Sequence, residues 1–252
     1  MTVTRIGDNL NNTISGITSN GFLGGDRQDL ISGLGGNDSL RGYEGNDTLI
    51  GGSGEDLLIG SDDTVIIQGE DDDVLYGDSI GDYSAGGKDV LFGNRGEDTL
   101  YGGGAFDYLY GGSENDSLFG QGGGDHLMGN GGNDTLSGGT GNDTLIGSDY
   151  SLQGSGEYDR LSGGSGADRF VIGSGSQVHY LGNGYATITD FDYGEGDKII
   201  AGGDFSDYTL KPSINNRGAS DLDIVVRYKG DIIAIVYDTP DLTRIFDFES
   251  NV

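Results

Sequence analysis

Apolar residues recur every nine positions through the middle of the chain, and each follows a group of small polar residues. Written with glycine first, residues 93–146 form six unbroken units, which read GNRGEDTLY, GGGAFDYLY, GGSENDSLF, GQGGGDHLM, GNGGNDTLS and GGTGNDTLI. Position eight is apolar in every unit, and the pattern extends from Ile31 to Phe170. A fixed short period predicts a solenoid, in which a repeat buries its apolar side chain only by stacking on its neighbours.

The nine positions divide into a turn and a short strand. Positions one to six are rich in glycine, asparagine, serine and aspartate, which are turn residues. Positions seven to nine alternate around one apolar residue, so they predict a strand of three residues. A helix is disfavoured because each interior glycine would cost about 1 kcal/mol. The register resumes after four insertions, which we expect to form loops near 17–23, 61–67, 78–83 and 148–153.

The composition narrows the class of protein. The 252 residues include 52 glycines, 2 prolines and no cysteine, with a net charge of −29. A low apolar content with a high net charge is typical of a disordered chain. A disordered chain does not require a fixed repeat, however, so the regular period argues against disorder. The charge argues against nucleic acid or an anionic membrane as a partner, because both bind basic patches. The longest apolar stretch, Ile232 to Tyr237, is too short for a membrane span.

An aspartate occupies position six of each unit, and it points to metal chemistry. Aspartates stacked about 4.8 Å apart, the spacing of neighbouring strands, repel each other by roughly 3 kcal/mol per pair at an effective dielectric of 20. A divalent cation between neighbours removes this repulsion, and oxygen ligands favour Ca²⁺ over Zn²⁺ or Mg²⁺. We therefore predict that calcium binding and folding are one event. The predicted ligands are Asp29, Asp38, Asp47, Asp56, Asp73, Asp89, Asp98, Asp107, Asp116, Asp125, Asp134, Asp143, Asp159 and Asp168.

GGTGNDTLI and its neighbours resemble the RTX (hemolysin-type) calcium-binding nonapeptide G-G-x-G-x-D-x-U-x over about residues 24–171. The resemblance implies an all-β fold, a right-handed parallel β-roll solenoid in which two units form one coil. It also implies that calcium lies between aspartates eighteen residues apart and is held partly by turn carbonyls. We expect these to be the carbonyls of Gly33, Gly36, Gly42, Gly45, Gly51, Gly54, Gly93, Gly96, Gly102, Gly111, Gly120, Gly123, Gly129, Gly132, Gly138, Gly141, Gly163 and Gly166.

Alternate units define two rows of aspartates, one beginning at Asp38 and the other at Asp29. Seven aspartates leave six gaps in each row, so we expect about eight to twelve calcium ions. A degenerate unit at 7–15 places Asn12 at position six. Five units lack the glycine at position four, and we expect a strained turn there. The residues in its place are Arg27, Asp71, Ala105, Glu114 and Glu157.

Three regions follow from these patterns. Residues 1–23 are a degenerate N-terminal cap, 24–171 the calcium-binding roll, and 172–252 a β-rich C-terminal cap. The last region has longer β-like runs at Ala186–Phe191, Asp221–Tyr228 and Asp231–Tyr237, and Gly230-Asp231 predicts a hairpin turn. The stretch ADRFVIGSG…ATITDFDYGEGDKI is similar to the C-terminal flank of RTX proteins, which implies type I secretion and an extracellular location.

Enzyme activity is not predicted. Neither His126 nor His179 belongs to an HExxH motif, there is no GxSxG motif, and there is no cysteine. We predict a secreted calcium-binding module with a structural or adhesive role at the cell surface and a candidate glycan or cell-surface partner. Two alternatives stay open: an accessory module of a polysaccharide-acting enzyme, and a carrier for secretion and folding.

Bulky side chains at position nine are expected to face outward. They form a stripe that either binds a glycan or partner or packs ring on ring across the rungs, and we favour the second interpretation. The residues are Tyr76, Phe92, Tyr101, Tyr110, Phe119 and Met128.

Overall fold

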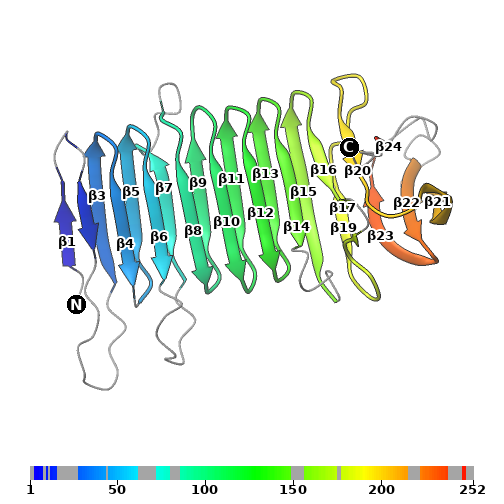
Figure 1. Cartoon of the computed structure of the whole chain (residues 1–252), viewed down its shortest axis with the longest axis horizontal. Coiled ribbons are helices and arrows are strands. Elements are labelled where there is room, and N and C mark those ends of the chain that lie inside the picture. Colours follow the sequence, from blue (N-terminus) through cyan, green and yellow to red (C-terminus); the bar gives the residue numbers. More distant parts are fainter. Residues whose placement is uncertain are drawn as a thin grey trace, which may run out of the picture.

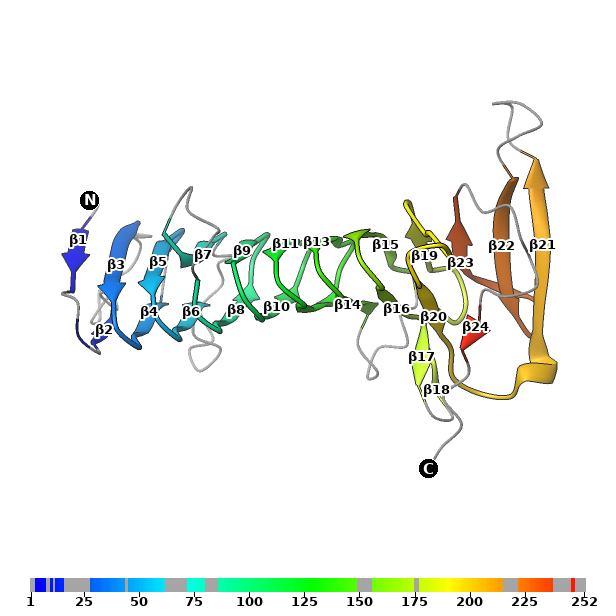
Figure 2. The same ribbon diagram turned by 90° about the horizontal axis from the view of Figure 1, so that it is seen from above.

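The computed structural model is an elongated stack of short strands in two layers (Figure 1, Figure 2). Successive strands alternate between the layers, so each coil contributes one strand to each sheet. The structure describes residues 3–7, 10, 12–15, 28–43, 45–61, 72–79, 86–148, 156–174, 177–214, 222–237 and 246–247.

The first layer, here called the odd sheet, contains twelve strands of the described chain. In spatial order they are β1 (Val3–Ile6), β3 (Asp29–Gly35), β5 (Thr48–Ser53), β7 (Val74–Asp78), β9 (Thr99–Gly103), β11 (Ser117–Gly122), β13 (Thr135–Thr140), β15 (Tyr158–Ser165), β19 (Tyr185–Ile188), β23 (Asp231–Val236), β22 (Leu222–Tyr228) and β21 (Tyr208–Ile214).

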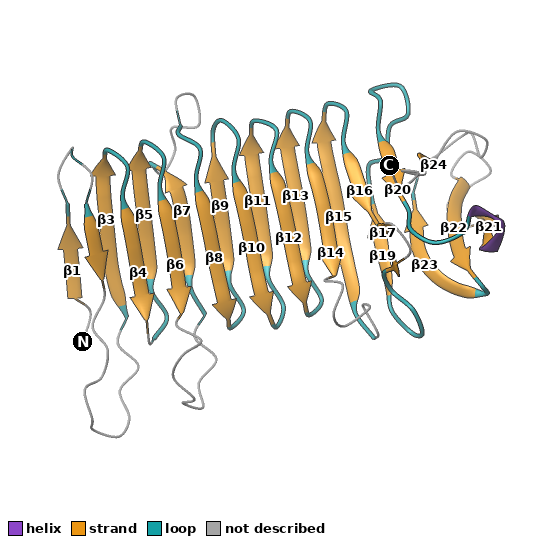
Figure 3. Ribbon diagram, viewed as in Figure 1, coloured by secondary structure: helices purple, strands orange, loops and turns teal. Residues whose placement is uncertain are grey.

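The second layer, the even sheet, contains ten described strands. They are β2 (Thr13–Ser15), β4 (Ser39–Tyr43), β6 (Leu57–Ser61), β8 (Val90–Arg95), β10 (Tyr108–Ser113), β12 (His126–Gly131), β14 (Thr144–Ser148), β16 (Arg169–Val171), β20 (Lys198–Ile200) and β24 (Phe246–Asp247). A separate hairpin pairs β17 (Gly173–Ser174) with β18 (Gln177–Val178), and a short 3-10 helix, η1, covers Phe205–Asp207 (Figure 3).

Neighbouring strands of the repeat region pair in parallel, with equivalent positions opposite each other. Leu109 pairs with Leu91 on one side and Leu127 on the other, a separation of eighteen residues. Where the chain carries an insertion the same register holds, so Leu49 pairs with Leu75. The predicted parallel β-roll is confirmed. The predicted insertion loops lie largely outside the described residues.

Apart from β2 and β16, the strands of the repeat region are longer than the predicted three residues, so that prediction is wrong for most units. β10, for example, contains positions seven to nine of one unit and positions one to three of the next. The glycine-rich positions continue the parallel ladder, and Gly112 pairs with Asn94. Only positions four to six remain as the turn between the two sheets.

The core is a narrow file between the sheets, with one position-eight side chain from each sheet in every coil. Each coil contributes two position-eight residues, and all of them from Ile31 to Phe170 have an exposed fraction of 0%. Because each side chain contacts its neighbours along the file, burial depends on stacking, as the repeat pattern predicts. The thin core also places the position-six aspartates beside apolar side chains, where they are cut off from water.

Both sheets continue beyond residue 171. Phe170 pairs with Ile199 in the even sheet and Leu161 pairs with Ile188 in the odd sheet. After β23 the odd sheet becomes antiparallel through β22 and β21. Strands β19, β22 and β23 lie at the three predicted β-like runs, although β19 ends at Ile188. The hairpin turn lies at Lys229 and Gly230, with φ of 50° and 102°, one residue before the predicted Gly230-Asp231.

Candidate metal centre

The position-six aspartates stack in the two predicted rows, one along each edge of the roll. Each carboxylate points inward from the end of a turn and is no more than 3% exposed. From Asp47 onward, Oδ1 of each aspartate accepts a hydrogen bond from the backbone N–H of the aspartate one coil earlier. In the even row the Asp38 N–H donates to Asp56 and the Asp107 N–H donates to Asp125, at 2.7 and 2.8 Å. The bond from Asp56 to Asp89 crosses an insertion, again at 2.7 Å.

The odd row repeats this arrangement. The Asp29 N–H donates to Asp47 at 2.7 Å, and the Asp116 N–H donates to Asp134 at 2.8 Å. The bond from Asp134 to Asp159 crosses an insertion at 2.8 Å. From Asp47 onward, one oxygen of each carboxylate is therefore fixed by the backbone, which aims the other oxygen in the same direction in successive coils.

The second oxygen, Oδ2, identifies the rows as candidate cation sites. It is buried and accepts no hydrogen bond in a long series of coils. A buried carboxylate is expected to have partners for both oxygens, because an unpaired charge away from water is costly. The residues are Asp38, Asp56, Asp89, Asp107, Asp116, Asp125, Asp134, Asp143 and Asp168.

Backbone carbonyls from the next coil lie beside these oxygens. A Cβ added to Gly138 would overlap Asp143 Oδ2 and lie 2.6 Å from the carbonyl oxygen of Gly163. The same overlap with a carboxylate oxygen occurs at Gly120 and Gly129. Glycine at position one therefore keeps open a space into which a carboxylate oxygen and a carbonyl oxygen both point. This space and donor set fit Ca²⁺, which takes carboxylate and carbonyl oxygens in flexible geometry.

Few acidic side chains surround any one of these spaces between coils. Among the described residues, no three aspartate, glutamate or histidine side chains converge on one point. An ion in a row must therefore take carbonyl oxygens as well as carboxylates, as the predicted ligand set requires. Of the predicted carbonyls, those of Gly51, Gly93, Gly102, Gly111, Gly120, Gly138 and Gly163 lie next to the Cβ position of the glycine one coil earlier.

Position four adopts the left-handed conformation that favours glycine. The carbonyl of Gly123 lies inside contact distance of a Cβ added at Gly141, so this position also allows close approach between coils. Ala105 and Glu114 adopt the same conformation with φ of 74° and 78°, which confirms the expected strain at those two turns. Glu157 does not have a positive φ, so the strain expected at its turn is not found; the positive φ lies at Gly156 instead. Arg27 and Asp71 lie outside the described residues. The predicted position-four glycines with positive φ are Gly36, Gly45, Gly54, Gly96, Gly123, Gly132, Gly141 and Gly166.

Position two has positive φ as well, which the sequence analysis missed. Several of its residues are not glycine, so the composition gave no signal. They are Leu34, Tyr43, Asn94, Gln121 and Asn130, with φ between 74° and 84°.

Burial controls the electrostatics of the rows. Burial raises the pKa of Asp116 to about 9, and the neighbouring Asp134 and Asp98 carboxylates also raise it. The hydrogen bond from the Asp98 N–H lowers this pKa, but by less. The pKa values of Asp89 and Asp107 rise to about 8, again chiefly through burial. Adjacent carboxylates in a row therefore resist ionisation together near neutral pH unless a cation lies between them.

Asp78 is a further buried carboxylate that the repeat pattern does not mark. It is 5% exposed and accepts hydrogen bonds from the Gly104 N–H at 2.7 Å and the Gly87 N–H at 3.3 Å. Its charge contributes to the raised pKa values of Asp56 and Asp89. Asp78 therefore adds negative charge to the even edge where the chain carries an insertion.

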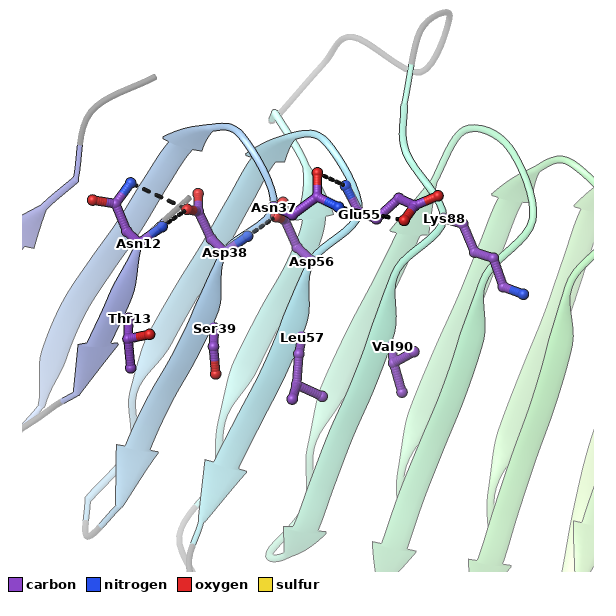
Figure 4. A pocket seen from close by; sticks show the side chains of 10 residues that line it. All are labelled: Asn12, Thr13, Asn37, Asp38, Ser39, Glu55, Asp56, Leu57, Lys88 and Val90. Atoms are coloured by element: carbon purple, nitrogen blue, oxygen red, sulfur yellow. Dashed lines mark hydrogen bonds between the residues drawn. The ribbon is translucent and has the colours of Figure 1, made fainter. Parts of the chain in front are cut away.

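The ends of the rows differ from the middle. At the N-terminal end, Asn12 occupies position six of the degenerate unit, and its backbone N–H donates to Asp38 Oδ1 at 2.6 Å (Figure 4). At the C-terminal end, the Asp168 N–H donates to Asp197 Oδ1 at 2.9 Å. Asp197 was missed, although the signal was present in GDKII, where an apolar residue follows two positions after the aspartate.

The odd row ends at a tyrosine hydroxyl instead. Tyr180 is fully buried, and its hydroxyl donates to Asp159 Oδ2. Asp159 pairs with Ala186 in the next strand, so the register has no further carboxylate in this row. Tyr180 follows no repeat pattern, and the sequence alone gives no reason to place it there.

A groove of about 570 Å³ follows the N-terminal part of the even row (Figure 4). It is lined by positions five to seven of successive coils, including Asn37, Glu55 and Lys88. The Asn37 amide donates to Glu55 at 3.3 Å, and on the odd edge the Asn133 amide donates to Asn115 at 3.1 Å. Position five thus forms polar ladders on the solvent side of the carboxylate rows.

The bulky position-nine side chains pack on each other, and the favoured interpretation is confirmed. Tyr76, Tyr101 and Phe119 stack with ring centroids 4.8 and 5.0 Å apart, and Phe92 stacks on Tyr110 at 4.8 Å. Because the stacked rings belong to adjacent strands, their faces point along the roll and their edges point outward. Stacking of a sugar needs an open ring face, so this arrangement does not favour a glycan platform.

A parallel β-roll with a buried carboxylate at every turn defines a calcium-binding solenoid. The family model for the RTX calcium-binding nonapeptide repeat matches in four copies, at residues 23–58, 83–118, 119–149 and 151–176. These copies cover more than half of the chain. The chain therefore belongs to this family. Its repeats bind multiple Ca²⁺ ions and are typically structural, not catalytic.

No curated protein matches the chain. Within the described residues, no helix has the length and apolar character to cross a membrane.

Proposed function

We propose that the protein is a secreted calcium-binding module that folds as about eight to twelve ions enter the two rows of carboxylates. The series of buried Oδ2 atoms that accept no hydrogen bond carries this proposal. Bound calcium supplies the positive charge that these oxygens lack. The chain supplies the rest: the backbone N–H groups aim the carboxylates, and the position-one glycines keep the space between coils open.

The concentration of calcium gates this fold. The apolar core has only two position-eight side chains in each coil, so it offsets only part of the entropy lost when the chain becomes ordered. Without ions, the closed roll would also hold its carboxylates in an apolar setting that raises their pKa values. In a compartment with little calcium the chain therefore stays unfolded, and at millimolar calcium outside the cell it closes.

A structural or adhesive role at the cell surface follows from the same properties. The closed roll is a long rod whose two ends lie far apart (Figure 2). Its acidic surface keeps it soluble and separates copies. RTX repeat proteins are typically secreted, which supports an extracellular location. We assign the module no catalytic step.

Circular dichroism and calcium titration test the proposal. In EGTA at pH 8, we expect a disordered spectrum, and added Ca²⁺ should convert it to a β spectrum while equal Mg²⁺ does not. Asp116→Asn keeps an acceptor for the Asp98 N–H but loses charge, so it should raise the calcium midpoint several-fold. The matched control is Asp231→Asn, which changes an exposed carboxylate outside the rows and should leave the midpoint unchanged. A β spectrum that persists in EGTA at pH 8 would contradict the coupling.

A further inference from the structure

We propose that the even row has one more calcium site than the nonapeptide array provides, between Asp168 and the loop that ends at Asp197. This inference rests on the proposed function. Asp168 belongs to the last matched repeat, whereas Asp197 lies beyond residue 176, where the match to the repeat family ends.

The loop that ends at Asp197 reproduces the backbone of a repeat. The Lys198 N–H donates to the Asp168 carbonyl at 2.8 Å, just as the Arg169 N–H donates to the Asp143 carbonyl at 2.8 Å. The Asp168 N–H donates to Asp197 Oδ1, as in each earlier coil. Two residues later, Ile199 has an exposed fraction of 0% and extends the core file. Asp197 therefore occupies position six of an additional coil.

The gap in front of this coil contains the same unsatisfied oxygen as the gaps before it. Asp168 is 0% exposed, and its Oδ2 accepts no hydrogen bond. A Cβ added to Gly163 would overlap that oxygen, so the space beside it is kept open as in the array. An unpaired carboxylate oxygen at nearly complete burial points to a cation at this position.

Other carboxylates surround the gap but are already engaged. Asp190 accepts hydrogen bonds from the Ser162 hydroxyl and the Gly163 and Gly164 N–H groups, at 2.7, 3.0 and 2.9 Å. Glu195 accepts one from the Gly166 N–H at 2.9 Å. They contribute negative charge beside Asp168 without satisfying its free oxygen, which increases the attraction for a divalent cation.

The odd row shows how a row without such a site ends. There the Tyr180 hydroxyl donates to Asp159 Oδ2, and it lies beside the Cβ position of Gly147. At the equivalent point of the array, beside Gly138, the carbonyl of Gly163 is found instead. Tyr180 thus satisfies the last carboxylate with a protein donor. The even row has no such donor on Asp168 Oδ2, which is why the two row ends differ in their need for calcium.

Counting ions by native mass spectrometry in saturating calcium tests the site. Asp197 accepts the Asp168 N–H on Oδ1 and the Asp192 N–H on Oδ2, at 2.9 and 2.8 Å. Asp197→Asn keeps the first acceptor, loses the second and removes the charge, so we expect one ion fewer per chain. Tyr180→Phe is the matched control at the end of the other row, and we expect no ion to be lost. An unchanged count in Asp197→Asn would overturn the proposal.

Calcium anomalous scattering from crystals of the unaltered protein gives a second test that does not depend on a variant that folds. A peak between Asp168 and residues 192–197 supports the site. If the other gaps of the even row contain calcium and this one is empty, the inference fails while the proposed function stands. If no gap contains calcium, the proposed function itself fails.

Discussion

At the scale of single residues, the roll depends on which positions carry a Cβ. A Cβ at position one would overlap the carboxylate of its own unit, as at Gly138, and a Cβ at Gly141 in position four would overlap the carbonyl of Gly123 in the previous coil. Position two has an equally unusual φ, and a Cβ added at Gly112 would overlap the previous coil in the same way, yet other coils have leucine, tyrosine or asparagine there. Individual coils therefore accept a side chain at positions two and four, whereas position one is glycine in every unit of residues 93–146.

We expect Ala105→Gly to stabilise the calcium-saturated protein by about 1 kcal/mol, because it removes the strain of an alanine at φ of 74°. Glu114→Gly is the control. It relieves a similar φ but removes a carboxylate that accepts hydrogen bonds from the Gly96 N–H at 3.1 Å and the Ser113 hydroxyl at 2.7 Å. Thermal unfolding in excess calcium should show a gain for the first variant and none for the second. A lower unfolding temperature for Ala105→Gly would refute the strain argument.

The residue-level chemistry was predictable where it repeats. The aspartates and the apolar residues two places later follow from period and charge alone. Asp197 escaped because its unit has Asp192 and Glu195 where the array has glycine. Tyr180 escaped because its partner Asp159 lies 21 residues away, with no periodic signal to connect them.

At the scale of elements, each coil contacts only the coils before and after it. Strands were predicted too short, because a glycine-rich segment reads as a turn even where its backbone continues a ladder. On the outer faces, aromatic rings of adjacent strands stack on each other. Only some coils have such a ring at position nine, so the rings stabilise particular coils, whereas the buried leucines are nearly the same in every coil.

Tyr101 is the middle ring of a stack of three, so its removal should cost more than that of an end ring. Each stacked pair contributes roughly 0.5–1.5 kcal/mol, and Tyr101 has partners in both Tyr76 and Phe119. We expect Tyr101→Ala to destabilise the calcium-bound protein by about 1 kcal/mol more than Phe119→Ala does. Urea unfolding at saturating calcium measures the difference. Equal losses would mean that the rings contribute only by burial.

At the scale of the whole molecule, we expect protons and calcium to compete for the same carboxylates. Burial raises the pKa of Asp143 to about 7, that of Asp134 to about 8 and that of Asp116 to about 9, from 3.8. For an acid whose pKa is higher in the folded state, protonation favours folding. The contribution of this protonation to stability is complete below the pKa of the acid in the unfolded state. It is lost as the pH rises through the pKa of the acid in the folded state.

The calcium-free protein should therefore gain β structure as the pH falls from about 9 to about 4. Over the same range the calcium midpoint should rise, because protons displace the ion. Circular dichroism in metal-depleted buffer, repeated with a calcium titration at each pH, measures both trends. A calcium-free β signal that instead grows with rising pH would show that the rows do not behave as coupled buried acids.

Because successive strands of the repeat region alternate between two sheets, adding or removing an even number of units has a different effect from adding or removing an odd number. Removing or duplicating eighteen residues would shorten or lengthen the rod by one full coil and return every later strand to its own sheet. A change of nine would send every later strand to the opposite sheet, so the line of carboxylates that starts at Asn12 would finish at Tyr180 and not at Asp197. Growth of such an array by whole coils preserves its two unlike ends, whereas growth by single units exchanges them.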